Sequence, residues 1–260
     1  MKPHTFAVCA YRDSPYLEAC IRSLKGQSVP TDIILCTSTP SPYIMDMADK
    51  YGIPVHVREG KSRIMDDWNF AYHMADSRFV TIAHQDDMYQ KDYVKLLLES
   101  WKRYHDMTLF TGGYTVVKKD MLVKFEKVEF IKRFLRLPLR LRPLSHLRAV
   151  KRSVLLFGNS ICCPACTYNK ELLGEPLFDS PYQFALDWDT LWKLAERDGR
   201  FICIERPLMY YRIHEEATTK ACIKDNSRAR EEAEMFAKMW PKPVVKLLMH
   251  YYRRAYEEYE

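Results

Sequence analysis

The stretch Phe79-Val-Thr-Ile-Ala-His-Gln-Asp-Asp87 joins a short apolar run directly to an acidic turn. An apolar run of this length is typical of a strand that is buried on both faces of a parallel sheet. Adjacent carboxylates at the end of such a strand repel each other unless a cation or hydrogen-bond donors compensate their charge. The turn therefore predicts either a divalent-ion site at Asp86 and Asp87 or a cap for the next helix.

The chain before this stretch alternates strand and helix signals. Apolar runs predict strands at residues 5–10, 33–36 and 54–57, and apolar residues at helical spacing predict helices at 17–24, 43–51 and 64–75. This βαβαβαβ order predicts an α/β fold: a mostly parallel sheet with right-handed crossovers and helices on both faces. Ligands of such sheets bind beyond the carboxyl ends of the strands, so the loops after Ala10, Cys36 and Ala83 are the expected functional region.

The rest of the chain is less regular. The pattern predicts helices at 92–104 and around 188–195, a strand at 107–117, and a loop-like and strand-like stretch at 155–168. Shorter strands are predicted at 201–204 and 208–211. A helical segment is predicted from 226 onward, broken at Pro241 and Pro243.

Charge is concentrated in one segment of the 260 residues. Residues 118–152 hold twelve Lys and Arg against three Asp and Glu, a local charge of +9, so the remainder carries −3 of the total of +6. Apolar side chains interleave with these cations, as in Phe130-Ile-Lys-Arg-Phe134. A basic amphipathic stretch suits an anionic membrane surface or a lipid diphosphate, whereas a solvated insertion or a dimer contact is the structural alternative. Nucleic acid is disfavoured because no nucleic-acid-binding motif accompanies the charge.

Several protein classes are disfavoured by what the chain lacks. There is no apolar leader before the first strand and no apolar run long enough to span a bilayer, which predicts a cytoplasmic protein, either soluble or peripheral on the membrane. The eight cysteines are predicted to be reduced thiols, with a zinc site at Cys162, Cys163 and Cys166 as the alternative. No GxGxxG, GxxxxGK[ST], GxSxG or HExxH motif is present. A bound nucleotide must therefore be held by side chains and a metal ion.

Two further patterns carry candidate chemistry. Leu186-Asp-Trp-Asp189 opens a predicted helix, where the acids serve either as a helix cap or as functional carboxylates. Tyr210-Tyr-Arg-Ile-His214 is a strand that ends in a cation and a possible metal ligand, although a single histidine is more often structural.

Together these patterns resemble glycosyltransferase family 2, whose members have the GT-A fold, over roughly residues 5–219. Family members open with a strand, an aromatic turn and a helix, here Val8-Cys-Ala-Tyr-Arg-Asp-Ser-Pro-Tyr-Leu17. An aspartate pair follows their fourth strand, here His84-Gln-Asp-Asp87. An acidic dipeptide then precedes a helix rich in Trp and Leu, here Leu186-Asp-Trp-Asp189, and a later strand ends in Tyr-Arg-x-His, here Tyr211-Arg-Ile-His214.

The resemblance implies a nucleotide-binding edge. Tyr11, next to Ala10, would lie against the base, Gln85 would lie near the ribose, and Arg63 would contact the nucleotide. The family often has an aspartate pair after the second strand, where this chain has Thr37-Ser-Thr39, so Thr37 takes that place.

The resemblance also implies a metal site and a base. Asp86 would hold Mn²⁺ or Mg²⁺ on the diphosphate, with His214 completing the site and with His84 and Asp87 supporting it. His84 stands where the family has the first acid of its DxD pattern. Asp187 would be the general base that takes the acceptor proton and should be ionised at neutral pH. The implied supporting residues in the second half are Asp189 and Arg212.

The implied enzyme is an inverting, metal-dependent glycosyltransferase of cell-surface polysaccharide synthesis. It would move a sugar from a nucleotide-diphosphate donor, with a UDP-sugar expected, to a hydroxyl of a glycan or lipid-linked acceptor. Residues 1–220 would form the GT-A domain, with a nucleotide-binding half (1–104) and an acceptor half (105–220), and residues 221–260 a helical extension. The alternatives are a catalytically inactive relative that serves as a binding subunit and a nucleotidyltransferase. The second would need a glycine-rich loop where the chain has Ala10-Tyr-Arg-Asp-Ser14. The oligomeric state has no signature in the sequence.

Overall fold

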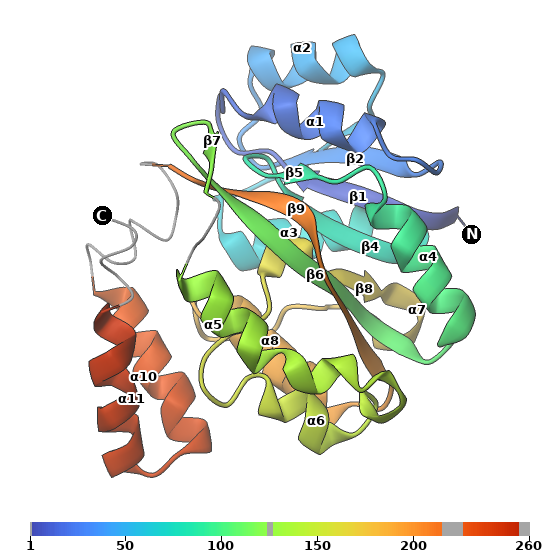
Figure 1. Cartoon of the computed structure of the whole chain (residues 1–260). Coiled ribbons are helices and arrows are strands. Elements are labelled where there is room, and N and C mark those ends of the chain that lie inside the picture. The colour runs from blue at the N-terminus through green and yellow to red at the C-terminus, as the bar shows by residue number, and fades with distance from the viewer. Residues whose placement is uncertain (1, 124–126, 215–225, 255–260) are drawn as a thin grey trace. The chain divides into compact units, whose positions relative to one another are not determined.

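The computed structural model describes residues 2–123, 127–214 and 226–254 (Figure 1). The chain divides into two compact units, each built from segments that are separate in the sequence. Unit 1 contains residues 1–115, 162–178 and 199–211, and unit 2 contains residues 116–161, 179–198 and 212–260. The predicted domain boundary at residue 220 lies outside the described residues and stays a prediction.

Unit 1 is built on a sheet whose strands run in the order β3-β2-β1-β4-β8-β6-β9-β5. The first four neighbours pair in parallel, and β8 pairs antiparallel with both β4 and β6. β5 pairs antiparallel with β9. The strands are β1 (Lys2–Cys9), β2 (Asp32–Thr37), β3 (Val55–Val57), β4 (Ser77–His84), β5 (Met88–Tyr89), β6 (Met107–Lys118), β8 (Thr167–Asn169) and β9 (Arg200–Ile213).

The order of the parallel strands contains a reversal at β1. From β1 the chain moves outward through β2 to β3, then crosses back to pair β4 with the other side of β1. Because crossovers are right-handed, a reversal of direction places the connecting helices on opposite faces of the sheet. The loops after β1 and β4 therefore diverge at a topological switch point, where sheets of this kind bind ligands.

The helices of unit 1 follow from apolar spacing and from their end residues. They are α1 (Leu17–Lys25), α2 (Pro42–Tyr51), α3 (Ile64–Met74), α4 (Tyr93–Arg103) and α7 (Lys170–Leu173). In α1 the buried side chains recur at helical spacing, from Leu17 to Leu24. α2 begins after Ser41, whose hydroxyl accepts the Ile44 N–H, and ends at Gly52 in the left-handed region.

A close approach of two strands explains a glycine pair in β6. β6 and β9 are neighbours in the sheet and run side by side in Figure 1. A Cβ at Gly112 would lie 2.7 Å from the Leu208 side chain, and one at Gly113 would lie 2.9 Å from the Glu205 carbonyl oxygen. The absence of side chains at these two positions permits this packing.

Unit 2 is mainly helical. It contains the short strand β7 (Met121–Leu122), which pairs with the end of β6, and the helices α5 (Lys127–Leu135), α6 (Arg148–Ser153), α8 (Leu186–Glu196), α10 (Ser227–Met239) and α11 (Lys242–Arg254). Trp188 of α8 meets Phe236 of α10 edge to face at 5.0 Å between ring centroids. The C-terminal helices thus pack into the core of unit 2.

The predicted α/β architecture is confirmed, including the alternation of strands and helices before Asp87. Two details differ from the sequence prediction. The strands predicted at 201–204 and 208–211 are one strand, β9, and the basic segment contains α5, α6 and two 3₁₀ turns. The break predicted at Pro241 is found, since α10 ends at Met239 and α11 begins at Lys242, whereas the break predicted at Pro243 is not, because Pro243 lies in the first turn of α11. None of the described helices is both long enough and apolar enough to cross a membrane.

Candidate functional site

The switch point is held together by a pair of reciprocal hydrogen bonds. The Tyr11 N–H donates to Oε1 of Gln85 at 2.9 Å, and Nε2 of Gln85 donates to the Tyr11 carbonyl oxygen, also at 2.9 Å. The side-chain amide that follows β4 therefore fixes the main chain that follows β1. Ala10 is buried, whereas the Tyr11 ring is 44% exposed, which leaves an aromatic face accessible at the carboxyl edge of the sheet.

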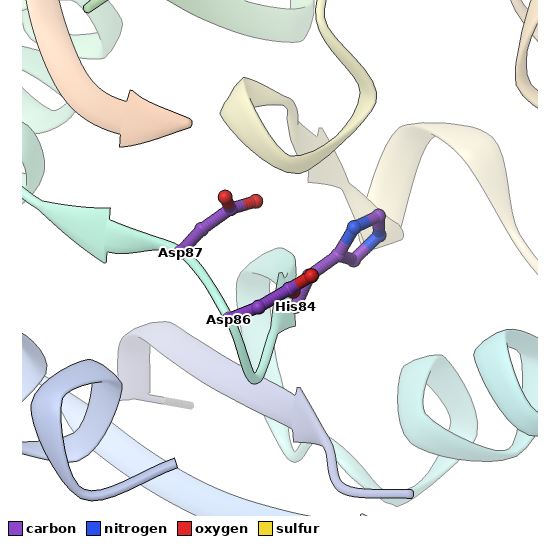
Figure 2. A group of neighbouring side chains, drawn as sticks. All are labelled: His84, Asp86 and Asp87. Carbon is purple, nitrogen blue, oxygen red and sulfur yellow. The ribbon is translucent and has the colours of Figure 1, made fainter. Parts of the chain in front are cut away.

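Three residues of the turn after β4 form a cluster with the composition of a metal site. His84, Asp86 and Asp87 each offer one ligand atom, and these atoms lie within 4.8 Å of one another. Figure 2 shows the three side chains leaving the chain around this turn, just before β5. Two carboxylates and an imidazole suit a divalent ion such as Mn²⁺ or Mg²⁺. Both of these ions bind carboxylate oxygens.

His84 is prepared for ligation by its surroundings. Its ring stacks on Trp68 of α3 at 5.1 Å between centroids, and Trp68 in turn contacts Phe178 at the same distance. Burial lowers the pKa of His84, against the opposing charge of Asp86, so the neutral imidazole that binds metals is favoured. Nε2 is buried and has no hydrogen-bond partner among the described residues. An unsatisfied buried nitrogen beside two carboxylates fits a divalent ion.

Helix capping does not explain the two carboxylates. α4 begins at Tyr93, and the residue at its cap position is Asp92, so β5 separates Asp86 and Asp87 from the helix. Asp87 is almost wholly buried, and the charges of both aspartates raise the pKa of the buried Cys20 thiol, after burial itself. The cysteines of the alternative zinc site are buried, and no ligand group that includes them occurs in the described part of the chain.

The end of β2 is tied to the loop after β1. Thr37 is buried, and its hydroxyl accepts the Thr39 N–H at 3.0 Å. The Thr39 hydroxyl accepts the N–H of Arg12 at 2.8 Å, where Arg12 has a positive φ of 54°. Asp13 accepts a hydrogen bond of 2.6 Å from the Ser41 hydroxyl. Threonine and serine hydroxyls thus organise the place where family members often have aspartates.

Arg63 occupies the cap position of α3 and is exposed. The loop that leads to it is fixed by Arg58, which pairs with Asp67 at 2.8 Å and donates to the carbonyls of Glu59 and Lys61. The N–H of Arg58 donates to the Thr37 carbonyl. Arg63 therefore lies at the end of a loop that hydrogen bonds fix, and this loop begins next to Thr37.

In unit 2, Asp187 lies in the first turn of α8 and is not its cap residue, which is Ala185. Oδ1 of Asp187 accepts the Trp188 N–H, and Oδ2 accepts a hydrogen bond from Nδ2 of Asn159, both at 2.8 Å. Burial raises the pKa of Asp187 to about 6, although these bonds and the charge of Lys132 on α5 oppose the rise. The expected ionisation at neutral pH agrees with this value, which also suits a general base.

The other residues predicted in this half have structural partners. The buried Asp189 accepts from Lys238 of α10 at 2.6 Å and lies 3.1 Å from Lys193. Burial tends to raise the pKa of Asp189, but Lys238, Ser180 and Lys193 outweigh it and hold the pKa below its ordinary value. Arg212 pairs with Asp120. His214 follows β9 in unit 2, whereas the acidic cluster belongs to unit 1.

Sequence reasoning missed several side chains that hold these residues. Asn159, Trp68 and Arg58 each contact a predicted site residue or its loop, but none belongs to the motifs. Asn159 lies 28 residues from its partner, so no local pattern marks the pair.

The model of glycosyl transferase family 2 matches residues 5–166, well over half of the chain. The chain belongs to glycosyltransferase family 2. The predicted enzyme class is thereby confirmed. No curated protein sequence matches the chain.

This family 2 chain is also similar to solved glycosyltransferase structures. They include Staphylococcus aureus TarS 1–349 with UDP-GlcNAc (15% identity, TM-score 0.62, covering 96% of this chain and 70% of that one). A second is the mannosyltransferase PcManGT from Pyrobaculum calidifontis with GDP-Man and Mn²⁺ (16%, 0.63, 95% and 68%). A third is glucosyl-3-phosphoglycerate synthase from Mycobacterium tuberculosis with Mn²⁺ and UDP-glucose (13%, 0.58, 92% and 79%). Identities this low establish the fold alone, and they confirm the predicted GT-A fold.

Proposed function

We propose that the protein is an inverting, metal-dependent glycosyltransferase that transfers a sugar from a nucleoside diphosphate donor, UDP-linked, to a hydroxyl of a glycan or lipid-linked acceptor. The observation that carries the proposal is the cluster of His84, Asp86 and Asp87 at the switch point of a family 2 chain. Similar structures that hold UDP-GlcNAc, or Mn²⁺ with a nucleotide sugar, support this assignment.

The donor's nucleotide would occupy the carboxyl edge of unit 1. Tyr11 offers its exposed ring to the base, and Ala10, Thr37, Gln85 and Arg63 complete the edge. Gln85 acts there by fixing the Tyr11 main chain. His84, Asp86 and Asp87 would hold the divalent ion, which supplies positive charge against the leaving diphosphate. His214 remains a further candidate ligand.

Asp187 would act as the general base of the transfer. Its carboxylate takes the proton of the acceptor hydroxyl while that oxygen bonds to the anomeric carbon and the bond to the diphosphate oxygen breaks. The pKa of about 6 keeps Asp187 mostly ionised near neutral pH and basic enough to accept a proton. A single displacement from the face opposite the leaving group inverts the anomeric carbon. In this scheme Asp189 and Arg212 support the surrounding structure through Lys238 and Asp120.

The same proposal places the enzyme on the cytoplasmic face of a membrane. On α5, Phe130, Ile131 and Phe134 are exposed, while the buried Arg136 beyond its end binds Glu129 and the Ser160 carbonyl. The helix is thus anchored on one side and apolar on the other. Exposed basic side chains occur on α5, at Lys127 and Arg133, and later in the basic segment, at Arg140 and Arg148. Apolar anchors among cations are complementary to anionic lipid, which suits a lipid-linked acceptor of cell-surface polysaccharide synthesis.

Donor binding is tested by thermal melting with UDP, GDP, ADP and CDP, each with and without Mn²⁺ or Mg²⁺. A ligand at a hundred times its Kd adds about 2.7 kcal/mol of stability. We expect a metal-dependent shift with UDP that Asp86→Ala abolishes and that the exposed helix variant Asp46→Ala keeps. A shift with another nucleotide instead of UDP would mean that the donor carries that nucleotide's base. No shift with any nucleotide would favour an inactive relative that serves as a binding subunit.

Membrane attachment is tested by sedimentation with vesicles. We expect binding to phosphatidylcholine vesicles that contain phosphatidylglycerol, little binding to phosphatidylcholine alone, and loss of binding in Phe130→Ser/Phe134→Ser. Met45→Ser, which removes an exposed apolar side chain from α2, should bind as the wild type does. Equal binding by the double variant and the wild type would refute this part of the proposal.

A further inference from the structure

The helix that carries Asp187 has no cap of its own. α8 begins after Ala185, whose methyl side chain cannot accept a hydrogen bond, and within the first turn the side chain of Asp187 accepts the Trp188 N–H. The first amides of a helix need acceptors, and an alanine at the cap position is unfavourable. The direction of the first turn, and with it that of the Asp187 side chain, therefore depends on how the peptides that lead into it are held.

A carboxylate from the C-terminal helix α10 accepts the N–H of Ala185 and those of the two residues before it. Oε2 of Glu231 accepts the N–H groups of Phe184 at 2.7 Å, Ala185 at 2.9 Å and Gln183 at 3.1 Å, and Oε1 lies 3.2 Å from the same Gln183 nitrogen. The Glu231 side chain is buried, with an exposed fraction of 4%. A buried carboxylate that gathers three consecutive amides is a strong, charge-assisted contact, and its charge suits the positive end of the helix dipole.

Other contacts of α10 converge on the same region. Lys238 binds the buried Asp189, two residues beyond Asp187, and the guanidinium of Arg228 lies 4.9 Å from the centroid of the Phe184 ring. Phe236 meets Trp188 edge to face. Residues both before and after Asp187 are therefore held by one helix that begins about forty positions later in the chain.

We propose that Glu231 is a positioning residue for the transfer reaction, because its carboxylate fixes the three peptides that lead into the first turn of α8 and so orients Asp187. This inference rests on the proposed role of Asp187 as the base. It makes the C-terminal helix α10 part of the catalytic unit of this protein.

The test compares Glu231→Gln, Glu231→Ala and a matched control, Glu232→Gln. Gln keeps one carbonyl oxygen as acceptor but loses the charge, whereas Ala removes every acceptor of the Glu231 side chain. Glu232 is the adjacent residue, equally buried, and pairs with Arg228 within α10. We expect kcat to fall roughly ten- to hundredfold in Glu231→Ala and less in Glu231→Gln, with the donor KM unchanged, since misplacement of a catalytic group costs this much. Glu232→Gln should keep its kcat.

Two further measurements separate the possible failures. Amide hydrogen exchange should accelerate at residues 183–188 in the Glu231 variants only. If exchange there is unchanged, Glu231 does not hold these peptides and the positioning role is wrong, whether or not activity is found. Asp187→Asn in the same assay reports on the base. If Asp187→Asn is inactive while Glu231→Ala keeps its kcat, the positioning role is wrong and the proposed function stands. If Asp187→Asn keeps full activity, the proposed function is wrong and the positioning role fails with it.

Discussion

Nδ2 of Asn159 donates a hydrogen bond of 2.8 Å to Oδ2 of Asp187, and this bond opposes the burial that raises the pKa of the carboxyl. The two residues come from separate segments of unit 2, the loop that follows α6 and the first turn of α8. Because the donor stabilises the ionised form, the pair sets the pH range in which Asp187 can accept a proton.

The pH profile of kcat should therefore have an acid limb. A base with a pKa of about 6 is ionised above this pH, so the rate is expected to reach a plateau above pH 7 and to fall about tenfold per pH unit well below 6. Asp187→Asn should lower kcat by about 10²- to 10⁴-fold and remove the limb. A steady-state profile with saturating donor and metal checks this, and an unchanged limb in Asp187→Asn would assign it to another group.

Asn159→Ala should move that limb to higher pH. Removal of the donor leaves burial as the dominant influence, so the pKa of Asp187 rises and less base is ionised at pH 6. The rate at pH 6 should fall more than the rate at pH 8. In the Asp187→Asn background the same substitution should leave the shape of the profile unchanged. Equal losses at both pH values would mean that Asn159 acts on packing alone.

Lys238→Met should destabilise the fold and make it more sensitive to acid. Breaking a buried ion pair costs about 3–5 kcal/mol, but Lys193 still lies near Asp189 and the Lys238 side chain is 36% exposed to solvent, so about 1–2 kcal/mol is expected. The depressed pKa of Asp189 contributes stability that is present above its unfolded value and lost as the pH falls through the lower folded value. In the variant this loss begins at higher pH. Urea unfolding from pH 7 to pH 4 measures both effects, with Lys246→Met as the exposed control.

The parallel half of unit 1 could be predicted because its signals are local. A strand buried on both faces must be apolar throughout, and β4 shows this pattern directly before its acidic turn. The prediction of two strands instead of β9 failed because Arg206 and Pro207 are exposed and interrupt the apolar run while the backbone continues as one strand. Burial and strand pairing are separate properties, and only burial is visible in composition.

The site was predictable to the same extent. Candidate residues at strand ends, such as Tyr11 and Asp86, could be proposed because parallel strands gather their carboxyl ends at one edge. Glu231 and Asn159 were not, since their partners lie 46–48 and 28 residues away and acid or amide side chains are ordinary on helices and loops. Arg136 illustrates the same limit: its charge suggests the surface, yet it is fully buried between Glu129 and the Ser160 carbonyl.

Gly113→Ala should destabilise unit 1. The added Cβ would lie 2.9 Å from the carbonyl oxygen of Glu205 and 3.3 Å from that of Arg206, and both obstacles are main chain of the neighbouring strand. Forcing an extra carbon into such a contact costs about 1–3 kcal/mol. Gly26→Ala is the control, because the nearest atom to its Cβ is 3.4 Å away. Equal melting temperatures for both variants would mean that β6 and β9 can move apart enough to fit the added carbon without a loss of unfolding free energy.

Gln85→Ala should weaken nucleotide binding with little effect on folding. The two hydrogen bonds between Gln85 and the Tyr11 main chain are exposed, so their loss changes the free energy of unfolding little. The Tyr11 ring, however, would no longer be held for the base, and a loss of about 1.4 kcal/mol corresponds to a tenfold weaker Kd. Gln85→Glu keeps an acceptor for the Tyr11 N–H but replaces the donor with a negatively charged oxygen that the Tyr11 carbonyl oxygen repels, so a weaker Kd than that of the wild type is expected. Calorimetric titration with the nucleotide and Mn²⁺ measures the series. If Gln85→Ala binds as tightly as the wild type, the base is recognised without Tyr11 in a fixed position, and the assignment of this edge to the base is wrong.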